Sequence, residues 1–235
     1  MKNKFDPLGP PGLPKSPTGI IGFDATPEAS FQMNVESVSA SISVLTRLKT
    51  ETRPQHDAIE AALDLTSETL TLDAYLGTLE RFHGFYRPLE AGLVKIGGWV
   101  ERGLDLTERQ KTRLLETDLR VLGVNNFEML PVCTDLPPHV TVTAAFGCLY
   151  VLEGATLGGQ VISQLLRNRL GVTPETGGRF FHAYGDRTGA MWQAFRAALT
   201  ASVVKPCDEE EVVSAAKDTF LKLQHWLSAK AITDE

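Results

Sequence analysis

Several features that mark other classes of protein are missing from this sequence of 235 residues. Its 23 basic residues are outnumbered by 29 acidic ones, so it lacks the basic excess that is typical of a nucleic-acid-binding protein. No apolar run approaches the roughly 18 residues that span a bilayer, and the N-terminus has no continuous apolar stretch like that of a secretory signal. We therefore expect a cytoplasmic protein that binds neither nucleic acid nor membranes.

Cysteine is scarce as well. Three cysteines are an odd number, and because none of them has CxxC spacing they indicate neither a disulfide framework nor a zinc site: Cys133, Cys148 and Cys207. Hydrophobic residues make up 43% of the chain, which is enough to bury a sizeable core, and the length suits one domain with a tail. Composition thus predicts a globular protein but does not indicate its function.

Proline is concentrated at one end of the chain. Six of the 13 prolines fall within residues 1–40, where glycine and serine fill the gaps between them. Such a segment cannot bury enough apolar surface to offset the entropy that is lost when it becomes ordered. We therefore predict a disordered tail over 1–40, followed by a single domain over 41–232.

From residue 41 onward, apolar residues recur with the spacing of helices. The predicted helices cover 44–63, a stretch from Asp73, a stretch from a capping box at 107–110 to just before Gly123, 139–170, 186–203, and a last stretch that opens with the acidic residues 208–211. No run of alternating β-branched residues competes with this pattern. The sequence therefore predicts an all-α fold, a single-domain bundle of six or more helices.

The first predicted helix carries a group of polar side chains on one face. At about 100° per residue, Lys49, Thr52, His56 and Glu60 fall within roughly 80° of one another, and Arg53 flanks them. An imidazole with a carboxylate one turn away suits a metal ligand whose partner steadies the ring. The two cations could contact an anionic ligand held by that imidazole. A solvated helix face with a capping residue would produce the same pattern.

Pro54 interrupts this helix, because it cannot donate a hydrogen bond to the carbonyl of Thr50. Either the helix kinks, or it starts late with Thr52 and Gln55 as a capping box. Both alternatives keep His56 one turn from its carboxylate neighbour, and only the placement of the residues before the proline differs.

The predicted helix over 139–170 contains three glycines within six residues: Gly154, Gly158 and Gly159. Each costs a helix about 1 kcal/mol relative to alanine. A helix tolerates this where it bends or where another group approaches its backbone closely. That group could be a flat ligand or a neighbouring helix. The spacing is not that of a dinucleotide-binding fingerprint, and no strand precedes it.

Taken together, these segments resemble the heme oxygenases, especially their bacterial biliverdin-producing members. The pattern Leu-Lys-x-x-Thr-Arg-x-x-His-x-x-x-Glu at 48–60 is similar to the proximal helix of the family, and Gly-x-x-x-Gly-Gly-Gln at 154–160 is similar to the distal helix. The stretch 180–196 is similar to the segment that begins a later helix. The three segments occur in the same order and at matching separations.

The resemblance implies an enzyme that opens heme. His56 would be the proximal ligand of the heme iron with Glu60 beside it, while Lys49, Arg53 and Arg196 would face the propionates; Thr52 would also belong to the heme-binding residues. The resemblance further implies that heme is both substrate and cofactor. Dioxygen and electrons from a reductase or ferredoxin would drive its conversion to biliverdin, carbon monoxide and iron, and a phytochrome-type photoreceptor could accept the biliverdin.

On the distal side, the resemblance implies that Gly154, Gly158 and Gly159 let the helix bend over the heme, so that its backbone and ordered water contact dioxygen. The sequence departs from the family at Ala155, where many members carry a carboxylate that orders the water network for proton delivery. Water held by other groups would then deliver protons, and Thr156 is a candidate for holding it.

Three other functions fit parts of the sequence. The first is a non-catalytic heme- or tetrapyrrole-binding protein that keeps His56 but has lost turnover together with the distal acid. The second is a thiaminase-like enzyme, which would need a cysteine nucleophile with a nearby base. The third is a helical interaction module without a ligand, and the basic residues beside His56 argue against it.

Overall fold

The computed structural model describes residues 43–63, 65–138 and 140–229, and every regular element within these residues is helical. The all-α prediction is confirmed, whereas the predicted tail over 1–40 lies outside the described residues. The α-helices are α1 (Val44–Glu51), α2 (Arg53–Leu63), α3 (Leu72–Ile96), α4 (Thr112–Val121), α5 (Val142–Leu170), α6 (Arg179–His182), α7 (Thr188–Ser202) and α8 (Pro206–Ser228). Short 3-10 helices lie between some of them: η1 (Val100–Arg102), η2 (Leu106–Arg109), η3 (Phe127–Met129) and η4 (Gly185–Arg187).

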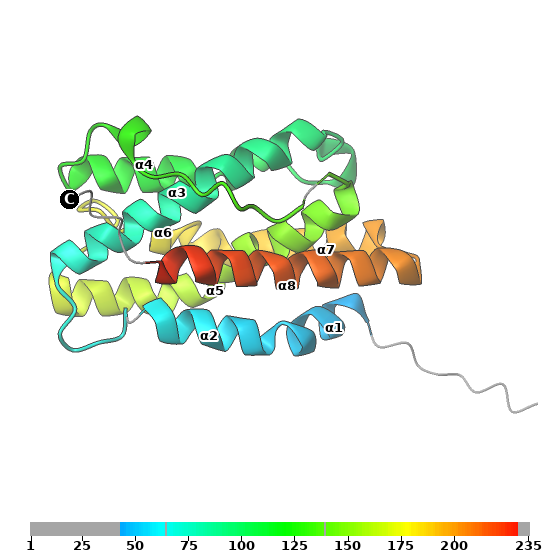
Figure 1. The fold of residues 1–235 in the computed structure, drawn as a ribbon, viewed down its shortest axis with the longest axis horizontal. Helices are drawn as coiled ribbons and strands as arrows, with labels where there is room; N and C mark the ends of the chain where they lie inside the picture. Colours follow the sequence, from blue (N-terminus) through cyan, green and yellow to red (C-terminus); the bar gives the residue numbers. More distant parts are fainter. Residues whose placement is uncertain (1–42, 64, 139, 230–235) are drawn as a thin grey trace, which may run out of the picture. The chain divides into compact units, whose positions relative to one another are not determined.

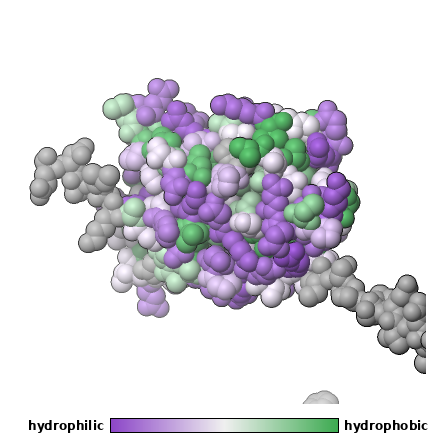
Figure 2. Space-filling model, turned by 45° about the vertical axis from the view of Figure 1, so that its right-hand side comes forward, coloured by the Kyte–Doolittle hydropathy of each residue, from purple (hydrophilic) through white to green (hydrophobic). Residues whose placement is uncertain are grey.

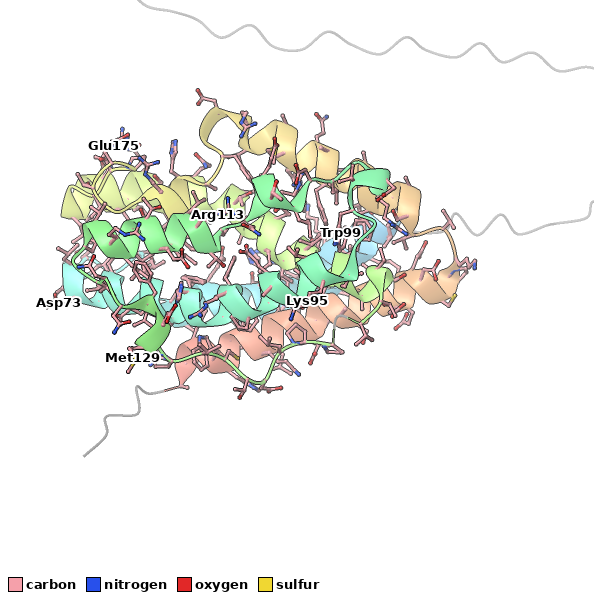
Figure 3. The ribbon with its side chains drawn as sticks, turned by 90° about the horizontal axis from the view of Figure 1, so that it is seen from above. Asp73, Lys95, Trp99, Arg113, Met129 and Glu175 are labelled. Carbon is pink, nitrogen blue, oxygen red and sulfur yellow. The ribbon has the colours of Figure 1, made fainter. Side chains whose placement is uncertain are left out.

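Helix α8 holds a central place in the arrangement shown in Figure 1. It packs along α5, and α1 and α2 pack against it from one side, while α3 lies on its other side with α4 next to α3. Helices α6 and α7 pack against α5. Figure 3 also shows α3 and α4 side by side, with Lys95 near the end of α3 and Arg113 on α4. The core between the helices is rich in fully buried aromatic rings, among them Tyr75, Tyr86, Phe85, Phe146 and Phe195.

Helix α5 is long and apolar enough to cross a membrane by length and composition alone. However, 61% of its most apolar 18-residue window is buried within the fold, where α6, α7 and α8 pack against it. Its apolar composition is therefore explained by its position inside the bundle. On the face of the molecule shown in Figure 2, hydrophilic residues predominate and hydrophobic ones form small separate patches.

The first predicted helix is divided at Thr52. The amide of Thr52 donates to the carbonyl of Leu48 (3.1 Å), and its hydroxyl donates to the same carbonyl (2.7 Å), so this side chain turns back onto α1. The amide of His56 in turn donates to the carbonyl of Thr52 (3.0 Å). Of the two predicted alternatives, the structure has the kink before Pro54, because the Thr52 hydroxyl is directed to α1 and does not cap α2.

The start of α4 differs from the predicted one. Asp105 accepts a hydrogen bond from the amide of Thr107 (2.8 Å) and so caps the short η2. Helix α4 begins only at Thr112, where Glu90 of α3 accepts from the amides of Lys111 (2.7 Å) and Thr112 (3.1 Å). The predicted capping box at 107–110 is wrong, because the acceptor that satisfies the first amides of α4 comes from another helix.

Later helix ends follow local signals, with one exception. Gly171 ends α5 with a left-handed φ of 68°, and Asp208 and Glu209 lie in the first turn of α8, where the helix dipole favours acidic residues. Asp186, where the predicted helix over 186–203 begins, does not belong to α7. It lies in η4, and this 3-10 turn leads directly into α7 at Thr188.

Asp118 of α4 anchors α6. Its buried carboxylate accepts hydrogen bonds from the amides of Arg179 (2.9 Å) and Phe180 (2.7 Å). Burial raises the pKa of this carboxyl to about 6, although both amides act in the opposite direction. Folding therefore favours the protonated carboxyl. Its contribution to stability is present below about pH 4 and is lost as the pH rises through about 6.

We expect a comparison with Asp118→Asn to reveal this dependence. Because an amide does not titrate, the wild type should lose up to about 3 kcal/mol of unfolding free energy relative to the variant between about pH 4 and 7. Urea unfolding of both proteins across this range measures the difference, and titrating groups common to both cancel. A difference that stays constant, or that shifts in favour of the wild type as the pH rises, would contradict a raised pKa at Asp118.

Candidate functional site

His56 lies on the first turns of α2, and its side chain is 49% exposed. Its Nδ1 atom is 3.7 Å from a carboxylate oxygen of Glu60 and 3.6 Å from one of Asp57. An acidic partner at Nδ1 favours a proton on that nitrogen and leaves Nε2 free to bind a metal. The predicted pairing of His56 with Glu60 is present, and Asp57 is a second partner that the sequence analysis did not single out.

Phe220 of α8 supports the His56 ring from the side. The two ring centroids are 6.1 Å apart, and the planes meet at 70°, so Phe220 contacts the imidazole edge to face. The ligand atoms of His56, Asp57 and Glu60 lie within 4.8 Å of one another, which is close enough for a shared cation. All three side chains are exposed, and of the three only imidazole is a common ligand of heme iron.

Helix α5 has an open face at its middle. A Cβ atom added to Gly158 would have no neighbour within 4 Å, and one added to Gly154 would meet only the indole of Trp192, at 3.9 Å. The apolar side chains on this part of α5, Leu157 and Val161, are 41% and 65% exposed. This stretch therefore offers an apolar, nearly smooth surface that a flat group can approach.

Gly159 has a different role from the other two glycines. A Cβ at this position would lie 2.7 Å from the carbonyl oxygen of Phe181 in α6, so Gly159 makes room for a neighbouring helix. Helix α5 is continuous from Val142 to Leu170, through all three glycines. A neighbouring helix therefore explains Gly159, whereas Gly154 and Gly158 leave room on the surface of α5.

Thr52 and Tyr150 join α5 to the kink between α1 and α2. Thr52 is buried, and its side chain lies next to that of Tyr150 on α5. In Figure 1, α2 and α5 run in the same direction. His56 follows Thr52 by one helical turn, and Gly154 follows Tyr150 by one turn. The contact therefore places the imidazole of His56 at the same level along the helices as the open face of α5. Thr52 was predicted to bind the ligand; the structure instead places it between two helices.

Three predicted cations are exposed around these segments. Arg53 is held by an ion pair with Asp57 (2.7 Å), the same carboxylate that lies beside His56. Lys49 is exposed on α1. Arg196 of α7 lines a shallow groove together with Leu45, which lies one turn before Lys49 on α1. The cations therefore come from three helices, α1, α2 and α7.

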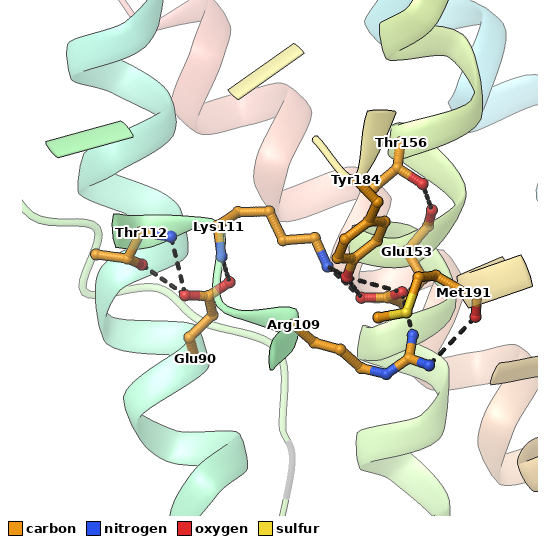
Figure 4. Close-up of polar contacts among 8 residues, drawn as sticks. All are labelled: Glu90, Arg109, Lys111, Thr112, Glu153, Thr156, Tyr184 and Met191. Carbon is orange, nitrogen blue, oxygen red and sulfur yellow. Dashed lines mark hydrogen bonds and ion pairs between the residues drawn. The ribbon is translucent and has the colours of Figure 1, made fainter. Parts of the chain in front are cut away.

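A buried charged group that was not predicted from the sequence lies next to Gly154. Glu153 is fully buried and accepts hydrogen bonds from Arg109, Lys111 and Tyr184 (Figure 4). A sequence signal for it exists: Glu153 is the one charged residue between positions 142 and 166, inside an otherwise apolar helix. A lone charge on a buried helix needs an ionic partner, because an unpaired one is too costly to bury.

Comparisons with known proteins agree with this geometry. The family model described as heme oxygenase matches residues 42–229. A heme oxygenase from Xanthomonas campestris pv. campestris is 32% identical over 166 residues, which are 68% of this chain and 92% of the relative. This match covers most of both chains.

Solved heme oxygenases share the fold. The NO- and CO-bound enzyme from Neisseria meningitidis has a TM-score of 0.66 at 22% identity, and covers 82% of this chain and 96% of its own. The heme oxygenase from Leptospira interrogans has a TM-score of 0.65 at 20% identity, with coverage of 80% and 99%. The heme complex of heme oxygenase-1 from Synechocystis has a TM-score of 0.64 at 15% identity, with coverage of 79% and 91%. Because the family match spans nearly all of the described residues, this chain belongs to the heme oxygenase family.

Proposed function

We propose that this heme oxygenase opens heme to biliverdin, carbon monoxide and iron with His56 as the axial ligand of the iron. The observation that carries this assignment is the His56 ring. It is half exposed and flanked at Nδ1 by the carboxylates of Glu60 and Asp57, and it lies one turn beyond the contact between Thr52 and Tyr150. The open face of α5 begins one helical turn beyond Tyr150, at Gly154.

The residues present fit a heme group. A neutral imidazole is a common axial ligand and leaves the opposite side of the iron available. The absence of side chains at Gly154 and Gly158 allows a planar ring to approach the backbone of α5, and Leu157 and Val161 offer apolar contacts. When bound, heme supplies both the iron that activates dioxygen and the macrocycle that is opened.

Lys49, Arg53 and Arg196 are proposed to hold the heme propionates. Arginine forms paired hydrogen bonds with carboxylates, and Arg53 is already fixed by Asp57 next to His56. Because the propionates determine how the macrocycle is rotated, these cations would determine which meso carbon is cleaved.

The open face of α5 carries no carboxylate. Ala155 is exposed at the position where many family members have an acid. Thr156, considered as a replacement, is buried, and its hydroxyl donates to the carbonyl of Glu153 (2.7 Å), so it is not available to hold water on the open face. Backbone groups and water on the glycine face are left as the proposed route for protons.

Ala155 is also the observation that favours a second candidate, a non-catalytic heme-binding protein of the same fold. The thiaminase-like alternative loses support, since burial raises the pKa of the Cys148 thiol to about 11 and also raises that of Cys133. A protonated, buried thiol is a poor nucleophile.

Electrons must come from outside the chain, and we propose a reductase or ferredoxin as donor and a phytochrome-type photoreceptor as one acceptor of biliverdin.

Hemin titration followed by reduction under oxygen tests the proposal. The purified protein should bind hemin with a new Soret band. On addition of reductant and oxygen, that band should be replaced by the absorbance of biliverdin as carbon monoxide appears, detected with ferrous myoglobin. A stable heme complex that yields no biliverdin would favour the non-catalytic binding protein. An unchanged hemin spectrum would contradict both.

A further inference from the structure

Glu153 precedes Gly154 on α5, and its side chain is fully buried. Its carboxylate accepts hydrogen bonds from Arg109 (2.5 Å), from the ammonium group of Lys111 and from the hydroxyl of Tyr184 (2.9 Å) (Figure 4). The ammonium group of Lys111 also donates to the hydroxyl of Tyr184 (2.8 Å). These four residues, Arg109, Lys111, Glu153 and Tyr184, form what we call the Glu153 cluster.

The Glu153 cluster joins four segments that are far apart in the sequence. Arg109 ends η2, Lys111 precedes α4, Glu153 lies in α5 and Tyr184 precedes η4. Lys111 is tied in addition to α3, because its amide donates to Glu90 (2.7 Å). The position of Gly154 along this side of the bundle is thus fixed by the residue just before it.

The geometry indicates that Glu153 affects the open face of α5, where heme is proposed to bind, without contacting the ligand. Successive residues of a helix are about 100° apart, so its side chain leaves α5 to one side of the open face at Gly154 and Gly158. Three donors already occupy its two oxygens. A buried carboxylate that is satisfied in this way holds other groups in place.

Arg109 extends the Glu153 cluster to the α7 side of the open face. Its second terminal nitrogen donates to the carbonyl of Met191 (3.2 Å), the residue before Trp192. The indole of Trp192 is the group that a Cβ atom added to Gly154 would meet, at 3.9 Å. Glu153, Arg109 and the backbone next to Trp192 therefore form one continuous connection that returns to α5 at Gly154.

Aromatic contacts limit the other directions in which the indole could move. Trp192 stacks on Phe195, with ring centroids 5.4 Å apart and planes at 24°, and it lies 5.8 Å from the ring of Tyr150. Tyr150 is also the residue that contacts Thr52 at the kink. The indole thus lies between the polar anchor from Arg109 and the contact that joins α5 to the histidine-bearing helix.

We infer that Glu153 is a positioning residue for the heme-binding face. Through Arg109 it holds the indole of Trp192 against Gly154 and thereby sets the shape of the α5 surface next to the bound heme. This role rests on the heme site proposed above. It assigns a function to a charge that neither ligates the iron nor contacts the heme.

The first test uses the heme-free protein, so that it does not depend on heme binding. The chain has three tryptophans, Trp99, Trp192 and Trp226. Labelling with 5-fluorotryptophan should give three ¹⁹F resonances, and Trp192→Phe identifies one of them. Glu153→Gln keeps the shape of the side chain but removes its charge, and it should shift or broaden the Trp192 resonance while leaving the other two unchanged.

Arg109→Lys keeps a positive charge for Glu153 but cannot bond to Met191 at the same time, so it should move the same resonance with less loss of stability. It also decides the outcome if Glu153→Gln fails to fold. Leu79→Ala removes a fully buried side chain on α3 and controls for general destabilisation. An unmoved Trp192 resonance in Arg109→Lys, or an equal change in Leu79→Ala, would overturn the inference.

The second test uses the ferric heme complex. In Glu153→Gln and Arg109→Lys, the pKa of the water on the iron, read from the acid–alkaline change of the Soret band, should differ from that of the wild type, whereas Leu79→Ala should leave it unchanged. An unchanged value in both cluster variants would count against the positioning role. If the wild type binds no hemin, the proposed function fails, and the ¹⁹F result still decides whether Glu153 places Trp192.

Discussion

Replacing His56 with alanine is expected to remove the axial ligand of the heme iron and with it the formation of biliverdin. The rate of biliverdin production should fall by more than about 100-fold, and hemin should bind more weakly with an altered Soret band. The unfolding free energy should change by less than about 0.5 kcal/mol, because the imidazole is half exposed and makes no buried hydrogen bond. Hemin titration, turnover under oxygen and urea unfolding measure the three quantities.

Two comparisons make this experiment specific. His225→Ala removes an exposed histidine from another helix, α8, and should leave binding and turnover unchanged. Added imidazole should restore the wild-type Soret band in His56→Ala, since it can occupy the vacated coordination position. A His56→Ala protein with the wild-type spectrum and no response to imidazole would show that another residue binds the iron.

Glu60→Gln tests the partner of the ligand. The amide cannot carry the negative charge that lies 3.7 Å from Nδ1, so His56 should become a weaker donor to the iron. We expect hemin affinity to fall by roughly tenfold, with a smaller effect on the Soret band than in His56→Ala. Asp57 remains 3.6 Å from Nδ1 and limits the loss. An affinity equal to that of the wild type would mean that Asp57 alone orients the ring.

The parts of the site that depend on local spacing could be predicted from the sequence. His56 and Glu60 are one turn apart in any helix, so their pairing does not depend on how α2 packs. Pro54 limited the helix around it to two conformations. The sequence could not choose between them, because the choice depends on whether the hydroxyl of Thr52 turns to α1 or to α2, and burial of Thr52 beside Tyr150 of α5 contributes to it.

Features that depend on tertiary contacts could not be predicted from the sequence. The first amides of α4 are satisfied by Glu90 of α3, so a plausible local capping box was not used. The carboxylate of Glu153 gathers donors from 44 residues before it and 31 residues after it in the chain. A lone acid in an apolar helix indicates that cations must reach it, but not which ones, because helix packing decides which side chains arrive.

The glycines of α5 also show which features can be predicted from local spacing and which depend on tertiary contacts. Sequence spacing drew attention to positions 154, 158 and 159, but the glycine of α5 that lies against the backbone of α8 is Gly147. A Cβ at Gly147 would lie 2.7 Å from that of Ala215 and 2.9 Å from the amide of Ala216, whereas one at Gly158 would meet nothing within 4 Å. Local sequence makes these two glycines look alike, although one faces a backbone and the other an open surface.

Alanine substitutions at these two positions are therefore expected to change stability in opposite directions. Gly147→Ala should lower the unfolding free energy by about 3 kcal/mol, because neither the α8 backbone nor a neighbouring Cβ can move aside without separating the two helices. Gly158→Ala should raise it by about 1 kcal/mol, since alanine is the better helix former and no contact opposes it. Urea unfolding of both variants beside the wild type measures the two changes.

Hemin binding provides a second test of Gly158. If the surface around Gly158 receives the macrocycle, the added methyl group should weaken hemin binding by roughly tenfold even as it stabilises the fold. A Gly158→Ala protein that is more stable and binds hemin as tightly as the wild type would place the macrocycle elsewhere on α5. Loss of stability at Gly158 would contradict the open face itself. Opposite changes in stability and affinity in one variant would show that this glycine is kept for its ligand, at a cost to the helix that contains it.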